Sequence, residues 1–122
     1  MKTKQEILNT LPNFYGTDNY FKWSMLFPQL VMTDGAKYIA DSCDAYWLMD
    51  AIASHFKSYK THGFAVAKLK QHSKGFVLRI EDGDDNALER QTIEYIDFPL
   101  DEITLYVVDS GDFWVILLPS EY

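Results

Sequence analysis

The 122-residue sequence has one cysteine, Cys43, only four prolines, and no long uninterrupted apolar run. A single cysteine excludes an internal disulfide and a zinc site built from several cysteines. Without a run of about 18 or more apolar residues there is no candidate membrane-spanning helix. The first residues contain no long apolar segment of the kind that secretion signals carry. We therefore expect a soluble, cytoplasmic protein that does not enter a membrane.

Apolar residues are nevertheless plentiful, and this argues for a folded chain. Hydrophobic residues make up 48% of the sequence and aromatic residues 16%, a composition that argues against intrinsic disorder. The length is sufficient for one modest hydrophobic core. We expect a single domain that spans residues 1–122.

Charge is distributed unevenly along the chain, whose net charge is −7. Residues 1–80 carry ten Lys and Arg against six Asp and Glu, whereas residues 81–122 carry one Arg against twelve Asp and Glu. Nucleic-acid-binding domains are usually basic, because contacts with phosphates supply most of their affinity. The chain as a whole does not fit that class, and nucleic acid is not the direct ligand that we first expect.

Capping residues predict two helices in the first third of the chain. Thr3, with Glu6 three residues later, forms a capping box for a helix over residues 3–11, which ends before Pro12. Thr33 is a suitable N-cap for a second helix. The apolar residues of that helix recur at helical spacing and so share one face; they are Ala36, Ile39, Ala40 and Cys43.

A longer helix should follow almost at once. Ser42 or Asp44 can cap it. Its apolar stripe is broad enough to face a core and comprises Ala45, Leu48, Met49, Ile52, Ala53 and Phe56. Because little chain separates the two helices, they should turn sharply against each other.

Most of the remaining chain has the composition of short strands. The predicted strands cover residues 20–23, 30–32, 64–71, 75–81, 91–98, 103–108 and 113–118. Residues 113–118 are apolar on both faces, as in an interior strand. Short connections favour antiparallel order. We predict an α+β fold: a mostly antiparallel sheet of five to seven strands, the helix pair of residues 33–57 packed on one face, and a short N-terminal helix at an edge or end.

Five segments of the chain form a recognisable set. They are Gly16-Thr17-Asp18 followed by Tyr20, Thr33-Asp34-Gly35-Ala36-Lys37-Tyr38, residues 45–53 (AYWLMDAIA), residues 95–100 (YIDFPL) and the final Leu118-Pro119-Ser120-Glu121-Tyr122. With these segments the chain resembles an uncharacterised family of small proteins from bacterial, phage and plasmid genomes. The resemblance implies no activity. It implies a mobile-element setting, in which small accessory proteins are common.

Residues that could support catalysis or metal binding have patterns that fit these roles poorly. Cys43 with His55 would make a nucleophile and base, but Cys43 lies on an apolar helical face, where a core position is expected. The histidines at 55, 62 and 72 do not match zinc-ligand spacings. Residues 82–86 resemble a calcium loop, yet Ala87 and Ile93 occupy positions that need Gly and Glu. We therefore predict no catalytic residues, no metal and no cofactor.

An unidentified protein partner is the favoured hypothesis, with two candidate contact regions. The acidic final third offers Asp84, Asp85, Asp101 and Glu102, and charge complementarity would accelerate encounter with a basic partner. Tyr46 and Trp47 flank the apolar helical stripe, and such residues are enriched at binding hot spots. The competing interpretations are a solvated acidic face and aromatic residues that complete the edge of the core.

A basic hairpin supports an alternative function, the binding of nucleic acid. Its candidate contacts are Lys60, Lys68, Lys70 and Lys74, in a region that also contains Lys57, Arg79, His62 and His72. By strand alternation, Lys68 and Lys70 share a face with Phe64, so charge and base stacking could combine there. Lysines that protect an edge strand are the competing interpretation. An unrecognised small enzyme is the third possibility, and a non-enzymatic accessory protein remains the favoured one.

Overall fold

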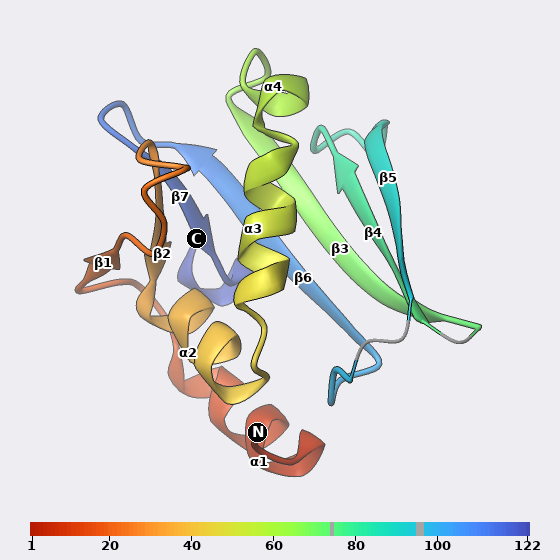
Figure 1. The fold of residues 1–122 in the computed structure, drawn as a ribbon. Helices are drawn as coiled ribbons and strands as arrows, with labels where there is room; N and C mark the ends of the chain where they lie inside the picture. The colour runs from red at the N-terminus through yellow and green to blue at the C-terminus, as the bar shows by residue number, and fades with distance from the viewer. Residues whose placement is uncertain (74, 95–96) are drawn as a thin grey trace.

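A computed structural model describes residues 1–73, 75–94 and 97–122. The helices are α1 (Lys4–Thr10), α2 (Asp34–Ser42), α3 (Tyr46–Ser54) and α4 (Phe56–Tyr59), with short 3₁₀ helices η1 (Leu11–Asn13) and η2 (Pro119–Glu121). The strands are β1 (Tyr20–Phe21), β2 (Leu30–Thr33), β3 (Phe64–His72), β4 (Gly75–Glu81), β5 (Ala87–Glu94), β6 (Glu102–Asp109) and β7 (Trp114–Leu117). Figure 1 shows one sheet with helices in front of it.

The seven strands form a single sheet in the order β1-β2-β7-β6-β3-β4-β5. Neighbouring strands are antiparallel except for β2 and β7, which run parallel. The α+β architecture and the mostly antiparallel sheet are therefore as predicted. The expected interior strand is also confirmed, because all four residues of β7 are buried between β2 and β6.

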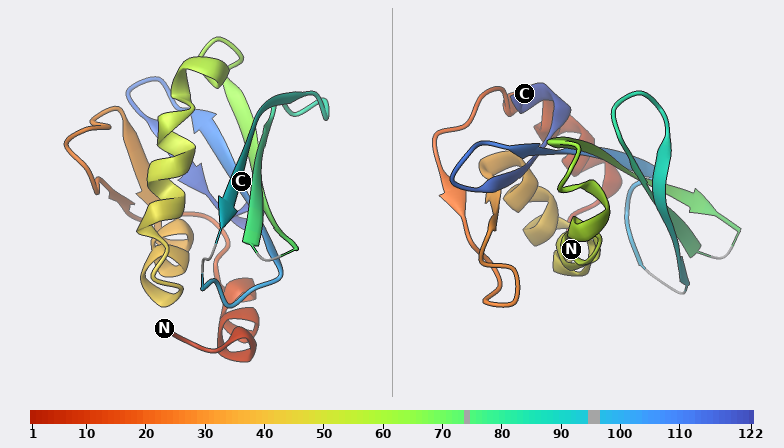
Figure 2. Two further views of the ribbon diagram at one scale, coloured as in Figure 1. Left: turned by 45° about the vertical axis from the view of Figure 1, so that its right-hand side comes forward. Right: turned by 90° about the horizontal axis from the view of Figure 1, so that it is seen from above.

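The helices cover one face of this sheet, and α1 lies toward one end of it (Figures 1 and 2). The apolar side of α3, with Leu48 and Ile52 fully buried, packs into the same core as Ala65 and Leu69 of β3. Beyond α3, two hydrogen bonds attach the helical segment to β5. His55 Nε2 lies 2.9 Å from Gln91 Oε1, and Ser58 Oγ donates to Glu89 Oε1 at 2.6 Å. In the described part of the chain, no helix lies against the opposite face of β3, β4 and β5 (Figures 1 and 2).

Two of the predicted helix starts are confirmed and one is wrong. Thr3 and Glu6 form the capping box of α1, and Thr33 caps α2. Neither Ser42 nor Asp44 caps the next helix, because α3 begins only at Tyr46. Ser42 is still the last residue of α2, and Asp44 adopts a left-handed conformation with φ of 49° that turns the chain sharply. The predicted long helix is also divided, since α3 ends at Ser54 and α4 starts at Phe56.

The predicted and observed strand boundaries differ most at β5. The sequence predicts a strand over residues 91–98, whereas β5 begins at Ala87 and is described as far as Glu94. A register shift between Ile80 and Glu81 lets β5 pair with the end of β4 directly after the turn. Of the predicted strand, residues 95 and 96 lie outside the described part. Across the described residues, no helix combines the length and apolarity that crossing a membrane requires.

Candidate functional site

A wide groove of about 750 Å³ lies on the open face of β3, β4 and β5. Strand alternation explains its lining, since Ala67 and Leu69 point into the core while Lys68 and Lys70 point the other way. Cross-strand pairing then aligns Lys68 with Arg79, and Arg79 with Arg90. The lining is mainly polar or charged and consists of Lys68, Lys70, Gln71, His72, Val77, Arg79, Glu81, Ala87 and Arg90.

Glu81 is the one carboxylate in this lining, and it positions two of the cations. Glu81 is buried, with only 4% of its surface exposed. Glu81 Oε1 lies 3.0 Å from Lys68 Nζ, and Oε2 lies 2.8 Å from Arg79 Nε. The side chains of Lys68 and Arg79 nevertheless remain 45% and 47% exposed. The carboxylate therefore aligns both cations without removing them from solvent.

The other two cations of the groove are not neutralised in this way. Within residues 1–73, 75–94 and 97–122, no carboxylate lies within ion-pair distance of Lys70 or Arg90. Among the described lining residues four cations thus accompany one buried carboxylate, and Glu102 lies across from Lys70 at the edge of this region. Because a hollow between low-dielectric walls concentrates the field of its charges, this groove favours anions even though the chain is acidic overall.

An aromatic cluster lies on the same open face. Phe64, the first residue of β3, packs against Tyr106 of β6 and against Tyr122, with ring centroids 5.3 and 5.7 Å apart. Tyr122 is 72% exposed. Phe64 and Lys68 point to the same side of β3, and four residues of strand separate them by about 13 Å. The cluster of Phe64, Tyr106 and Tyr122 therefore shares one face of the sheet with the cationic groove, at some distance along β3.

A second, smaller pocket of about 260 Å³ adjoins this aromatic cluster. Its apolar part is formed by Val108, Val115 and Leu117, from the open side of β6 and β7. The rest of its lining carries hydroxyl or carboxylate groups and comprises Thr17, Tyr20, Thr33, Ser110, Glu121 and Tyr122. No lysine, arginine or histidine contributes to this lining.

Glu121, beside this pocket, is buried and fully occupied by hydrogen bonds. Its Oε1 accepts from Thr33 Oγ1 at 2.7 Å and from the Leu118 amide at 2.9 Å. Its Oε2 accepts from the Gly35 amide at 3.0 Å and from Thr17 Oγ1 at 3.2 Å. The carboxylate thus joins the start of α2 to two distant segments, in a position that favours negative charge. This role is structural.

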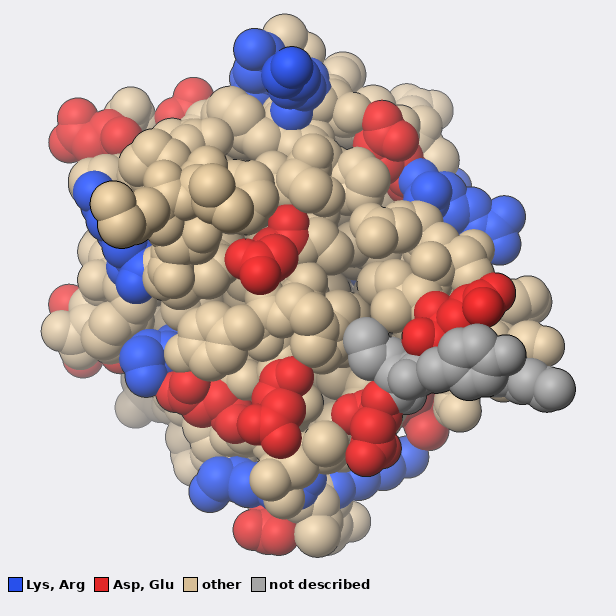
Figure 3. Space-filling model, viewed as in Figure 1, with Lys and Arg blue, Asp and Glu red and all other residues tan. Residues whose placement is uncertain are grey.

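The acidic residues proposed as a partner surface lie in two separate pairs. Asp84 and Asp85 lie in the turn between β4 and β5, whereas Asp101 and Glu102 lie where β6 begins. The register aligns Glu102 with residue 70 of β3 and Glu81 with residue 66, so the two pairs are separated by at least about 13 Å along the strands. Asp101 also forms an ion pair with Lys4 at 2.7 Å. On the helix-covered side, acidic and basic side chains are interspersed (Figure 3).

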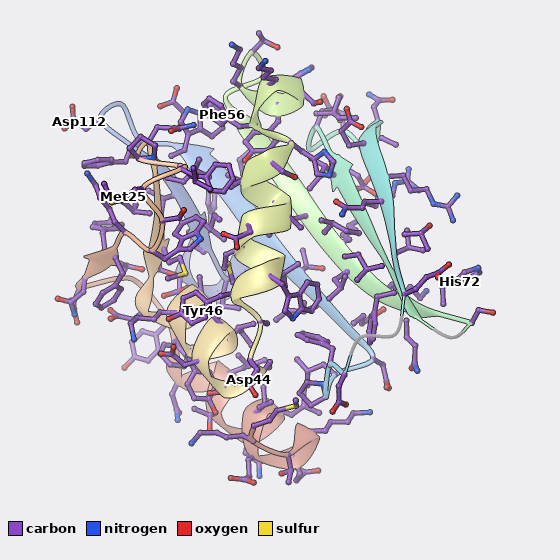
Figure 4. The ribbon with its side chains drawn as sticks, viewed as in Figure 1. Met25, Asp44, Tyr46, Phe56, His72 and Asp112 are labelled. Atoms are coloured by element: carbon purple, nitrogen blue, oxygen red, sulfur yellow. The ribbon has the colours of Figure 1, made fainter. Side chains whose placement is uncertain are left out.

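The second proposed contact region, Tyr46 and Trp47, is engaged within the protein. The Tyr46 hydroxyl donates to Asp41 Oδ1 at 2.6 Å, and this bond raises the pKa of Tyr46 above its ordinary value. Trp47 packs edge-on against Phe98, with centroids 6.0 Å apart. Figure 4 places Tyr46 near the start of α3. Partner contact through these residues stays a prediction.

Of the proposed nucleic-acid contacts, Lys68 and Lys70 lie in the groove. Lys60 is the C-cap of α4, on the helix side of the sheet, so it is not part of this site. Lys74 lies outside the described residues. The sequence interpretation missed Arg90, because the predicted strand began one residue after it. Extending the alternation of β5 back to Ala87 would have placed Arg90 on the open face.

The residues considered for catalysis and metal binding have other environments. Cys43 is fully buried, and burial raises the pKa of its thiol to about 11, so little nucleophilic thiolate exists near neutral pH. Asp82 accepts hydrogen bonds from the amides of Asp84 and Asn86, at 2.9 and 3.1 Å, and so closes its own turn. In the described part of the chain, no three His, Cys, Asp or Glu side chains are grouped as a metal site would need.

Comparisons with known proteins agree with the fold and assign no activity. A model described as "Family of unknown function (DUF6876)" matches residues 5–122. A crystal structure of a protein of unknown function from Enterococcus faecalis is similar, with a TM-score of 0.53 and 15% identity over 77% of this chain and 90% of that chain. At that identity the likeness concerns the fold alone. No curated protein matches.

Proposed function

The chain belongs to this family of unknown function, and we propose that it is a non-enzymatic accessory protein whose open sheet face binds single-stranded nucleic acid. One observation carries the proposal: the cationic groove and the partly exposed aromatic cluster share one face of the sheet. Proteins that bind single strands combine a positively charged groove with aromatic side chains on which bases stack. An accessory role also fits the resemblance to proteins of phage and plasmid genomes.

The geometry supports this hypothesis better than the acidic partner surface. Lys68, Lys70, Arg79 and Arg90 line one hollow, whereas the four proposed acidic contacts are divided between two ends of the sheet. Charges of one sign that line one hollow create a strong local field there, whereas charges divided between separate positions create a weaker one. The basic hairpin, first an alternative, is therefore the better-supported site.

Binding through so few cations should be modest and sensitive to salt. Each phosphate that a lysine or arginine neutralises releases counterions, and the slope of log affinity against log salt is about −0.7 per contact for single strands. Two to four contacts predict a slope between about −1.4 and −2.8. The net charge of −7 repels the rest of the polyanion, so we expect measurable affinity chiefly at low ionic strength.

The test is a fluorescence-anisotropy titration of a labelled single-stranded oligonucleotide at several salt concentrations. The variant Lys70→Gln/Arg90→Gln removes two cations whose side chains have no ion-pair role among the described residues. We expect roughly tenfold or greater loss of affinity at low salt and a shallower salt slope. The fold should be unaffected, because both side chains are exposed.

The matched control is Lys57→Gln/Lys60→Gln, which removes the same charge from exposed positions around α4. It should change affinity by less than about threefold, through the long-range field alone. The proposal fails if no single strand binds at low salt, or if both double variants lose affinity equally.

A further inference from the structure

The small pocket beside Tyr122 differs chemically from the cationic groove on the same face of the sheet. Its base is apolar, from Val108, Val115 and Leu117, and its lining includes no cation. The buried carboxylate of Glu121 stands at one side. A phosphate would therefore be repelled there, while a neutral group with one apolar face could enter without losing a charge interaction.

Two exposed tyrosines border the pocket, Tyr20 at 60% exposed and Tyr122 at 72%. Aromatic rings in such positions provide surfaces on which a planar ring can stack, worth about 1–3 kcal/mol per nucleobase. Tyr122 also contacts Tyr106 and Phe64, with ring centroids 5.5 and 5.7 Å apart. The pocket is thus linked through this cluster to the face that carries the groove.

Two of the polar side chains at the pocket, Thr17 and Ser110, offer a ligand acceptors rather than donors. Thr17 Oγ1 donates its proton to Glu121 Oε2 at 3.2 Å, and Ser110 Oγ donates its proton to the Phe113 carbonyl at 2.7 Å. A hydroxyl that has given its one proton to the protein can offer a ligand only its lone pairs. The pocket therefore suits a planar, neutral group that carries N–H donors.

We propose that this pocket holds one unstacked, amino-bearing nucleobase of the strand whose phosphates lie in the cationic groove, an inference that rests on the proposed function. The apolar floor of Val115 and Leu117 supports the ring, and Tyr20 and Tyr122 flank it. The exocyclic amino group donates to the hydroxyl oxygens of Thr17 and Ser110. The groove supplies charge attraction, and the pocket adds discrimination between bases.

The test compares short oligonucleotides that share one phosphodiester backbone. The first is abasic throughout, the second carries one adenine, and the third carries unsubstituted purine, which lacks the amino group, at that position. For the unaltered protein we expect adenine to strengthen binding roughly fivefold or more over the abasic chain. Purine should recover only part of that gain.

Variants then separate the pocket from the groove. Tyr20→Leu/Tyr122→Leu should abolish the gain from adenine while leaving the affinity for the abasic chain within about twofold, because no cation changes. Tyr15→Leu is the matched control, since Tyr15 is 80% exposed and does not line the pocket. Ser110→Trp, at an exposed position on the rim, should also block the gain by filling the entrance.

Failure of this inference is distinguishable from failure of the proposed function. If the abasic chain binds through Lys70 and Arg90 but adenine adds nothing, or if the tyrosine variant keeps the gain, the base pocket is wrong and the groove stands. Equal affinity for adenine and unsubstituted purine contradicts the role of the amino group. If neither natural nor abasic strands bind, both proposals are overturned.

Discussion

Glu121 and Glu81 are both buried carboxylates, 7% and 4% exposed, but their surroundings differ in kind. Glu121 accepts four hydrogen bonds from neutral groups, two of them backbone amides. Glu81 is held by two cations, Lys68 and Arg79. The first arrangement joins segments of backbone, whereas the second only positions long side chains. One buried carboxylate is thus part of the fold and the other is part of a surface.

The region around Glu121 also explains several of the segments that carry the family resemblance. Thr33 and Gly35 come from one such segment, Thr17 from another, and Leu118 and Glu121 from the last. They meet at the N-terminus of α2. The groove residues Lys70, Arg79 and Arg90 lie outside those segments. Glu121 therefore belongs to the region that builds the domain, and Glu81 belongs to the groove that we propose binds a ligand.

The largest expected effect is that of Glu121→Ala on stability. Removing the carboxylate leaves the Gly35 and Leu118 amides and the Thr33 hydroxyl buried without their acceptor. Each such group costs about 1–3 kcal/mol, so we expect the free energy of unfolding to fall by about 3–5 kcal/mol. Urea unfolding followed by circular dichroism measures it. The control Glu102→Gln, at an exposed carboxylate, should change stability by less than about 0.5 kcal/mol, and an equal loss in both would refute the comparison.

The next effect concerns Gly35, whose substitution tests how tightly Glu121 is held. A Cβ at Gly35 would overlap Glu121 Oε1 and come within 2.6 Å of Leu118 Cδ1. Gly→Ala in a helix normally stabilises by about 1 kcal/mol. Here we expect Gly35→Ala to destabilise by about 1–3 kcal/mol, because the position is overpacked. Thermal unfolding measures whether Gly35→Ala lowers or raises the stability. A stabilised Gly35→Ala variant would show that Glu121 is free to move. The cost should shrink in a Glu121→Ala background.

How far the sequence predicts these features depends on the range of the interactions. The caps at Thr3 and Thr33 were predictable because each involves residues three apart. The strand alternation that exposes Lys68 and Lys70 is equally local. The buried role of Glu121 was not predictable, since its partners Thr17, Thr33 and Gly35 lie more than 80 residues away.

The groove was predictable only in part, for a related reason. Lys68, Lys70 and Phe64 follow from the pattern of one strand, but Arg90 reaches the groove through the pairing of β4 with β5. That pairing includes a register shift at Glu81, which no local pattern reveals. The grouping of acidic residues in 81–122 along the chain likewise does not give their grouping in space, because Asp85 and Asp101 lie toward opposite ends of the strands.

The smallest expected loss of stability is that of Glu81→Gln. Lys68 and Arg79 are about half exposed, so both can turn to water when the carboxylate is neutralised, and we expect a cost of about 1 kcal/mol. Nucleic-acid binding should change in the opposite direction. With one negative charge removed from the groove, affinity for a single strand at low salt should rise and the salt slope should steepen. Anisotropy titration beside urea unfolding measures both. If Glu81→Gln binds a single strand more weakly, the alignment of Lys68 and Arg79 by Glu81 matters more than the negative charge that Glu81 brings to the groove. If Glu81→Gln loses as much stability as Glu121→Ala, the distinction between the two carboxylates is wrong.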